Sequence, residues 1–137
     1  MGLPFELKEG DRLPELKKTV TQANVYLYAQ ASRDFNPIHI DEKFARKTPL
    51  GGTIAHGMLI LAYVSQMLTD AFGVSWLTGG RLDVRFKSPA RPGDTVTVSG
   101  LVTAVQYTAG ERLVSISIDC QNQKGETVIT GEAGVRG

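Results

Sequence analysis

The segment from Gly57 to Phe72 has almost no polar face in its first two turns. Its residues 58 to 64 are MLILAYV, and its more polar side chains come only towards its end. A helix that is hydrophobic on every side is normally buried rather than laid on a surface. Gly73 follows in a suitable position for the C-cap. The sequence therefore predicts one long central helix that the rest of the chain has to cover.

The second half of the chain supplies that cover. Its apolar residues alternate with polar ones with a period of two, at Leu82, Val84, Phe86, Val96, Val98, Val102, Val114, Ile116, Ile118, Cys120, Ile129, Ala133 and Val135. This alternation is typical of an antiparallel sheet with one buried and one wet face. Pro89–Asp94, Gly110 and Lys124-Gly125 lie where turns are needed. A long helix and a run of antiparallel strands predict an α+β layer domain.

The N-terminal part predicts a strand or extended arm over Leu13–Val20 and a short helix over Gln22–Ser32. Thr19 has capping-box spacing to Gln22, and Thr21 is an alternative N-cap for the same helix.

A polar loop of enforced shape is expected over residues 33–41. Pro37 has no amide hydrogen and pushes Asn36 out of the helical region, so this stretch is not one continuous helix. A helical turn over Glu42–Lys47 and the glycine-rich Pro49–Thr53 follow.

Length and composition indicate a single soluble domain over residues 1–137. The 15 basic and 14 acidic residues leave a net charge of +1, which argues against nucleic acid or an anionic membrane as the main partner. The start, Met1–Glu6, lacks the features of a signal peptide, and no apolar run is long enough for a membrane span. Cys120 is the only cysteine, so no internal disulfide is expected. We expect a cytoplasmic protein.

Asp34 and His39 are the first candidates for chemistry. A carboxylate and an imidazole presented by one rigid loop, across the Asn36-Pro37 bend, can hold a water between them and act in general acid–base catalysis. The alternative is that Asp34 and Asn36 only brace the loop while His39 fills space.

His56 and Gly57 are candidates for a different reason, because they precede the apolar helix. The first amides of a helix have no internal partner and carry the positive end of the helix dipole. A thioester carbonyl against the Gly57 amide would be stabilised as its oxygen becomes enolate-like. The alternative is a glycine that only avoids a clash at the helix start.

Other chemistries receive less support. Ser32, Asp34 and His39 have the residue types of a nucleophilic triad, but no Gly-x-Ser-x-Gly elbow occurs. His39, His56 and Asp34 or Asp41 are metal-ligand types without a His-Glu-x-x-His spacing, so no metal is expected. No nucleotide-binding glycine motif is present either. Basic side chains that could meet coenzyme A phosphates, although most are expected to be solvated, are Lys43, Arg46, Lys47, Lys87 and Arg91.

Three stretches resemble the MaoC-like family, which includes the R-specific enoyl-CoA hydratases. Tyr28–Ala45, YAQASRDFNPIHIDEKFA, resembles the hydratase motif. Gly52–Leu59, GTIAHGML, is similar to the family's entry into its central helix, and Arg85–Asp94, RFKSPARPGD, is similar to a later strand and turn. Their order and spacing match, and the resemblance spans most of the chain.

The resemblance implies a hot-dog fold, with an antiparallel sheet wrapped around the central helix, and usually a homodimer. It implies that Asp34 and His39 are the catalytic pair, that Asn36 orients the loop or the water, and that Gly57 supplies the oxyanion contact. We also expect Ser32, His56 and Met58 to bind substrate. Ser32 is in addition expected to support Asp34.

The implied reaction is the reversible hydration of a trans-2-enoyl-CoA to an (R)-3-hydroxyacyl-CoA, without a cofactor beyond the coenzyme A of the substrate. An acyl-carrier-protein thioester, or a branched or dicarboxylic acyl-CoA, is an alternative substrate. Hot-dog thioesterases place an acidic residue on or near the central helix, where this chain has only Asp70, near the far end. A non-catalytic acyl-CoA binding subunit is a further alternative, against which the presence of both Asp34 and His39 counts.

Overall fold

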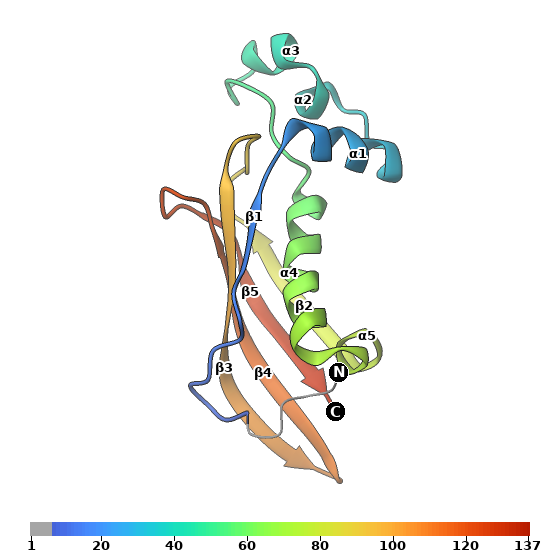
Figure 1. Cartoon of the computed structure of the whole chain (residues 1–137), viewed down its shortest axis with the longest axis vertical. Helices are drawn as coiled ribbons and strands as arrows, with labels where there is room; N and C mark the ends of the chain where they lie inside the picture. Colours follow the sequence, from blue (N-terminus) through green and yellow to red (C-terminus); the bar gives the residue numbers. More distant parts are fainter. Residues whose placement is uncertain (1–6) are drawn as a thin grey trace.

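The computed structural model describes residues 7–137, so the prediction made for Met1–Glu6 lies outside it. One sheet wraps around one long helix (Figure 1). In chain order the elements are β1 (Leu16–Thr19), α1 (Gln22–Ser32), α2 (Pro37–Ile40), α3 (Glu42–Arg46), α4 (Gly57–Phe72), α5 (Val74–Gly79), β2 (Gly80–Phe86), β3 (Thr95–Thr108), β4 (Glu111–Gln121) and β5 (Thr127–Arg136).

The sheet has five strands in the order β1-β3-β4-β5-β2, and every neighbouring pair is antiparallel. The three longest strands, β3, β4 and β5, are joined by hairpins, which place Ile116 opposite Ala133. Strand β2 returns along the far side of β5 and forms one edge. The α+β architecture predicted from the alternation is therefore confirmed.

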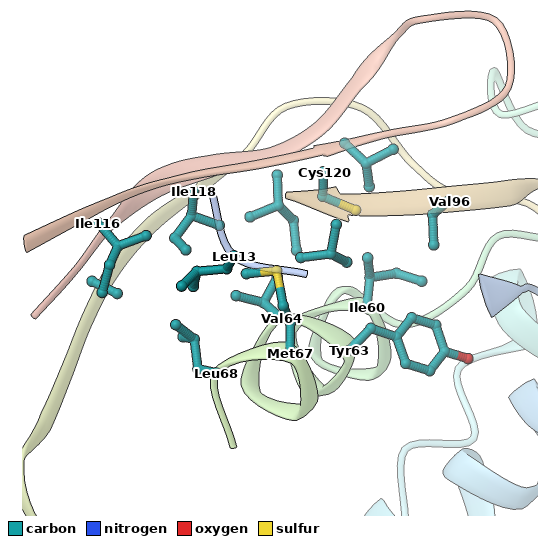
Figure 2. Close-up of a cluster of buried hydrophobic side chains, with 14 of the residues drawn as sticks. Leu13, Ile60, Tyr63, Val64, Met67, Leu68, Val96, Ile116, Ile118 and Cys120 are labelled. Atoms are coloured by element: carbon teal, nitrogen blue, oxygen red, sulfur yellow. The ribbon is translucent and has the colours of Figure 1, made fainter. Parts of the chain in front are cut away.

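The core lies between α4 and the sheet. Ile60, Val64, Met67 and Leu68 of α4 are at most 1% exposed and point toward the strands (Figure 2). Gly100 shows how closely the layers approach, because a Cβ there would lie 3.2 Å from the Met67 side chain. Such close packing fixes the helix on the sheet.

The predicted bounds of α4 are confirmed. Gly73 has φ 58° and donates its amide to the Thr69 carbonyl, which ends the helix. The expectation that the helix is buried on all sides is wrong, because one face of it is exposed along its length, at Met58, Ala62, Gln66 and Asp70. Met58 in the first turn is 56% exposed. Phe86, expected on the buried face of β2, is 52% exposed. The described part of the chain therefore leaves about half of each of these two side chains uncovered.

Two short helices were not predicted. The loop expected over residues 33–41 contains α2, a single turn that begins at Pro37, where the missing amide hydrogen costs no helical bond. Helix α5 follows Gly73, although its sequence lacks an apolar period. Strand β1 is also shorter than Leu13–Val20. Leu13 lies before it, donates its amide hydrogen to the Gly100 carbonyl and has its side chain in the core.

Helices α1, α2 and α3 form a small cap at the end of the molecule where α4 begins (Figure 1). Thr21 is the N-cap of α1 and accepts the Asn24 amide, so the alternative cap at Thr19 is excluded. Among residues 7–137, no helix is both long and apolar enough to cross a bilayer. The cap brings residues 33–41 to the N-terminal end of α4.

Candidate active site at the start of the central helix

The loop that carries Asp34 is held by its own polar side chains. Arg33 has φ 64°, a left-handed conformation that is uncommon outside glycine, and it turns the chain sharply after α1. The Ser32 hydroxyl accepts the Asp34 amide at 3.2 Å. The Asp34 carboxylate accepts the Asn36 amide, and the Asn36 side chain accepts the Ile38 amide as the N-cap of α2. Ser32 and Asn36 therefore brace the backbone on both sides of Asp34.

His39 faces Asp34 from α2. Its Nε2 lies 3.9 Å from Asp34 Oδ2, with the His39 side chain 10% exposed and the Asp34 side chain 53% exposed. Its other nitrogen, Nδ1, lies 2.8 Å from the Ile54 carbonyl oxygen. A carbonyl oxygen only accepts, so Nδ1 carries a hydrogen and donates it. In the neutral ring, the lone pair is then on Nε2 and is directed toward Asp34.

His56 has the opposite arrangement. Its Nε2 lies 2.9 Å from the Asp34 carbonyl oxygen, so Nε2 carries the hydrogen. Its ring stacks on that of His39, with centroids 3.8 Å apart, and Tyr28 lies against it at 4.8 Å. Its Nδ1 is buried and has no partner among the described residues.

The separation between Asp34 and His39 allows one water at their side to bridge them. A water about 2.8 Å from both the carboxylate oxygen and the imidazole Nε2 spans their separation with ordinary hydrogen bonds. The pair offers two groups that can exchange protons with that water, which is the requirement for general acid–base chemistry.

Gly57 supplies the neighbouring feature. It is the first residue of α4, so its amide has no partner within the helix. It borders a hollow of about 240 Å³ whose lining is mostly apolar: Ile54, Ala55, Gly57, Ile60, Phe86, Lys87, Ser88, Pro89, Ala90 and Val128. A Cβ on Gly57 would lie 3.0 Å from the Phe86 ring, so the absence of a side chain lets this ring pack against the start of α4.

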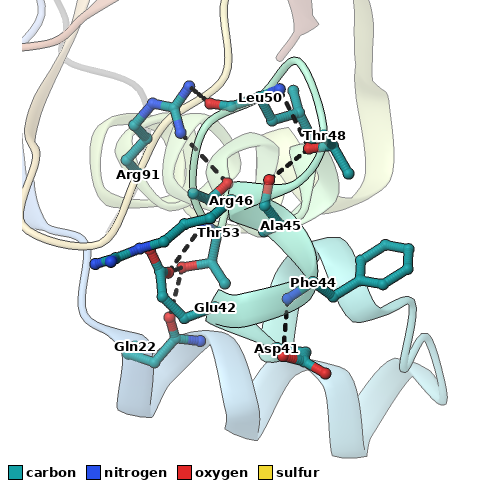
Figure 3. Close-up of polar contacts among 11 residues, drawn as sticks. Gln22, Asp41, Glu42, Phe44, Ala45, Arg46, Thr48, Leu50, Thr53 and Arg91 are labelled. Carbon is teal, nitrogen blue, oxygen red and sulfur yellow. Dashed lines mark hydrogen bonds and ion pairs between the residues drawn. The ribbon is translucent and has the colours of Figure 1, made fainter.

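A network of polar side chains that includes Gln22, Glu42 and Thr53 joins the helices of the cap (Figure 3). Glu42 accepts the Thr53 amide at 3.1 Å, and the Thr53 hydroxyl lies 2.9 Å from both the Glu42 carboxylate and the Gln22 side-chain oxygen. Gln22 in turn donates to the His39 carbonyl at 2.8 Å. The network therefore ties α1, α2 and α3 to the segment before α4.

Hydrogen bonds to the carboxylate lower the pKa of Glu42. The Thr53 amide is the main cause, followed by the Arg46 and Thr53 side chains. Two of the basic residues considered for coenzyme A phosphates are also engaged within the protein. Arg46 pairs with Glu42 at 3.0 Å, and Arg91 donates to the Leu50 and Gly52 carbonyls.

Three side chains of the kinds that bind metal ions lie close together at this site. One ligand atom each of Asp34, His39 and His56 lies within 4.8 Å of the other two. Two of the four ring nitrogens already donate to carbonyl oxygens. Asp41, the other acidic candidate, instead caps α3 by accepting the Phe44 amide. The lone Cys120 is buried in the core, and burial raises the pKa of its thiol to about 12.

The residues expected to bind substrate are placed differently. Met58 is exposed beside Gly57, whereas the Ser32 hydroxyl donates to the Tyr28 carbonyl and accepts the Asp34 amide. His56 is only 3% exposed and its ring faces Asp34 and His39.

Sequence reasoning missed Tyr28, Gln22 and Ile54 as parts of this site. Ile54 acts through its backbone carbonyl, which leaves no side-chain signal, and Gln22 had been considered only for helix capping. A larger hollow of about 490 Å³ lies on strands β2 to β5, and none of its lining residues belongs to the Tyr28–Gly57 region.

These features define a hot-dog domain with a carboxylate–imidazole pair at the start of its central helix. The MaoC like domain family matches residues 6–123, and the chain belongs to this family.

Two relatives and one solved structure illustrate the family. The chain is 35% identical to the (R)-specific enoyl-CoA hydratase of Rhodospirillum rubrum, over 95% of this chain and 88% of the relative. It is 32% identical to the mitochondrial 3-hydroxyacyl-[acyl-carrier-protein] dehydratase of Arabidopsis thaliana, over 93% and 75%. The (R)-hydratase structure from A. caviae has a TM-score of 0.80 and 31% identity, over 96% of this chain and 98% of that one.

The opposite bonding of the two imidazoles gives a direct prediction. Because these are the only histidines in the chain, nitrogen NMR of the neutral rings should show one of each tautomer. We expect the hydrogen on Nδ1 of His39 and on Nε2 of His56. Two rings in the same tautomer would contradict the hydrogen bonds to Ile54 and Asp34.

The Glu42 carboxylate predicts a pH-dependent contribution to stability. Its pKa is lowered in the folded state, so its bonds stabilise the protein above the ordinary value of 4.5 and this contribution is lost as the pH falls through the folded-state pKa. Glu42→Gln should therefore lower the free energy of unfolding at neutral pH, and the difference from wild type should shrink in acid. Urea denaturation at both pH values measures it. A difference that grows in acid would contradict the assignment.

Proposed function

We propose that this chain is a hydro-lyase that reversibly hydrates a trans-2-enoyl-CoA to an (R)-3-hydroxyacyl-CoA. The observation that carries the proposal is the 3.9 Å separation between His39 Nε2 and Asp34 Oδ2, near the Gly57 amide, which has no partner within α4. The family relationship supports the same reaction, since the relative from Rhodospirillum rubrum is named an (R)-specific enoyl-CoA hydratase.

In the proposed mechanism the thioester carbonyl accepts a hydrogen bond from the Gly57 amide. A water held by Asp34 and His39 attacks C3, loses one proton to the pair and leaves a hydroxyl on C3. Negative charge that develops on the thioester oxygen is stabilised by the amide and by the positive end of the α4 dipole. The pair delivers a proton to C2, so the elements of water are added in full. The two groups share these proton transfers as a coupled pair.

The acyl part of the substrate would occupy the apolar hollow beside Gly57, where Ile54 and Val128 are among the lining residues. Among the described residues that line this hollow, Lys87 is the only one with a charged side chain, and none is an arginine. The hollow therefore gives no support to a dicarboxylic acyl group held by an arginine. An acyl-carrier-protein thioester is the second candidate, supported by the relative from Arabidopsis thaliana.

A thioesterase is less well supported. The acidic residue on α4 is Asp70, which lies 13 residues after Gly57. At a rise of about 1.5 Å per residue the two positions are about 20 Å apart along the helix axis. A carboxylate at that distance does not reach a carbonyl bound at the Gly57 amide.

We further propose that the protein is a cytoplasmic homodimer of single-domain chains. Strand β2 is an edge of the sheet, and Phe86 and Met58, at the end of β2 and the start of α4, are both more than half exposed. Unpaired edges and exposed apolar side chains favour association. We propose that a second copy of this chain covers the β2 edge together with Phe86 and Met58. Light scattering should give twice the mass of 14.8 kDa, and a mass of one chain would contradict the dimer.

Asp34→Asn tests the proposed chemistry. The amide keeps the shape of the side chain and still accepts the Asn36 amide, but it no longer takes up a proton. We expect kcat for crotonyl-CoA and longer enoyl-CoAs to fall by about 10²- to 10⁴-fold. Loss of the conjugated enoyl absorbance measures hydration, and a thiol reagent run in parallel detects any thioesterase activity. Unchanged hydration in Asp34→Asn, or release of free thiol by the wild type, would contradict the proposal.

A further inference from the structure

His56 is almost completely buried and makes contacts on several sides. It is 3% exposed, its Nε2 donates to the Asp34 carbonyl at 2.9 Å, and its ring packs between His39 and Tyr28. A residue enclosed in this way has little surface left for a substrate. Its contacts are instead with the residue that carries the carboxylate and with the imidazole opposite that carboxylate.

The polar edge of this ring is kept at a cost. Within residues 7–137, Nδ1 is buried without a hydrogen-bond partner, and an unpaired buried polar atom loses its hydrogen bond to water without replacement. An apolar ring would fill the same space between His39 and Tyr28 without that loss. What an apolar ring lacks is the hydrogen on Nε2 and hence the bond to Asp34.

The hydrogen bond from His56 to the Asp34 carbonyl matters because of where His56 lies in the chain. The residue after it is Gly57, whose amide begins α4. His56 is therefore joined covalently to the proposed oxyanion donor and by a hydrogen bond to the residue that carries the carboxylate. A 2-enoyl thioester is conjugated and planar from its carbonyl oxygen to C3. The distance between the donor and the attacking water is consequently fixed by the substrate, and the protein has to match it.

We propose that His56 is a positioning residue that sets the spacing between the Gly57 amide and the Asp34–His39 pair. This inference rests on the proposed hydratase function. It replaces the substrate contact that the family resemblance implied for His56 with an indirect role. His56 contacts neither the substrate nor the water, and it acts through the backbone of Asp34 and the ring of His39.

Three variants distinguish the effect of the His56 hydrogen bond on kcat from the effect of its aromatic ring. His56→Phe keeps an aromatic ring but removes the donor, so kcat should fall by about 10- to 100-fold while KM changes less than about threefold. In His56→Gln the amide nitrogen reaches the place of Nε2, and we expect kcat within about fivefold of wild type. In His56→Asn the amide is too short to reach the Asp34 carbonyl, and kcat should fall like that of His56→Phe.

The control is Asn122→Ala, in the turn between β4 and β5. Asn122 accepts the Lys124 and Glu126 amides, so its loss should lower thermal stability without changing kcat. If His56→Phe does not fold, the comparison of Gln with Asn decides the question. Equal kcat in these two variants, or a rise in KM with unchanged kcat, would overturn the positioning role. Absence of hydration by the wild type with every thioester would instead overturn the proposed function.

Discussion

Helix α4 is held along its length by the packing of Ile60, Val64 and Met67 against the curved sheet. Because these side chains are buried and closely packed, the helix cannot slide or turn on the sheet without opening cavities. Its first amide, at Gly57, therefore has a fixed position relative to the strands. The cap formed by α1, α2 and α3 is built over this end of the helix, so the location of the whole site follows from the burial of α4.

The chemistry then depends on two backbone carbonyls, because each accepts a hydrogen bond from one imidazole nitrogen and so fixes the tautomer of that ring. Ile54 accepts from Nδ1 of His39 and leaves Nε2 for the carboxylate, while Asp34 accepts from Nε2 of His56. The network of Glu42, Thr53 and Gln22 holds the segments that supply these groups. The network, the cap helices and α4 together set the separation of 3.9 Å between His39 Nε2 and Asp34 Oδ2.

The fold could be predicted because its signals are periodic. The long apolar run of α4 and the alternation in β3 and β4 each reflect burial over many residues, and all three elements were predicted. Helices α2 and α5 were missed because each is too short to show a period. Phe86 was assigned to the buried face because alternation identifies a side of a strand but not what covers it. The residue types and the Asn36-Pro37 bend made Asp34 and His39 candidates, the resemblance favoured them as a pair, and the structure brings them together. Gln22 and Ile54 were not predictable, since their bonds to His39 span 17 and 15 residues and one uses only the backbone.

The most direct test of the central claim is a crystal structure of the Asp34→Asn variant with a bound 2-enoyl-CoA. We expect the thioester oxygen to lie within hydrogen-bonding distance of the Gly57 amide. We also expect C3 to face residue 34 and His39, with a water that bridges these two side chains. A thioester bound away from Gly57, or a C3 atom that no water between residue 34 and His39 can reach, would contradict it.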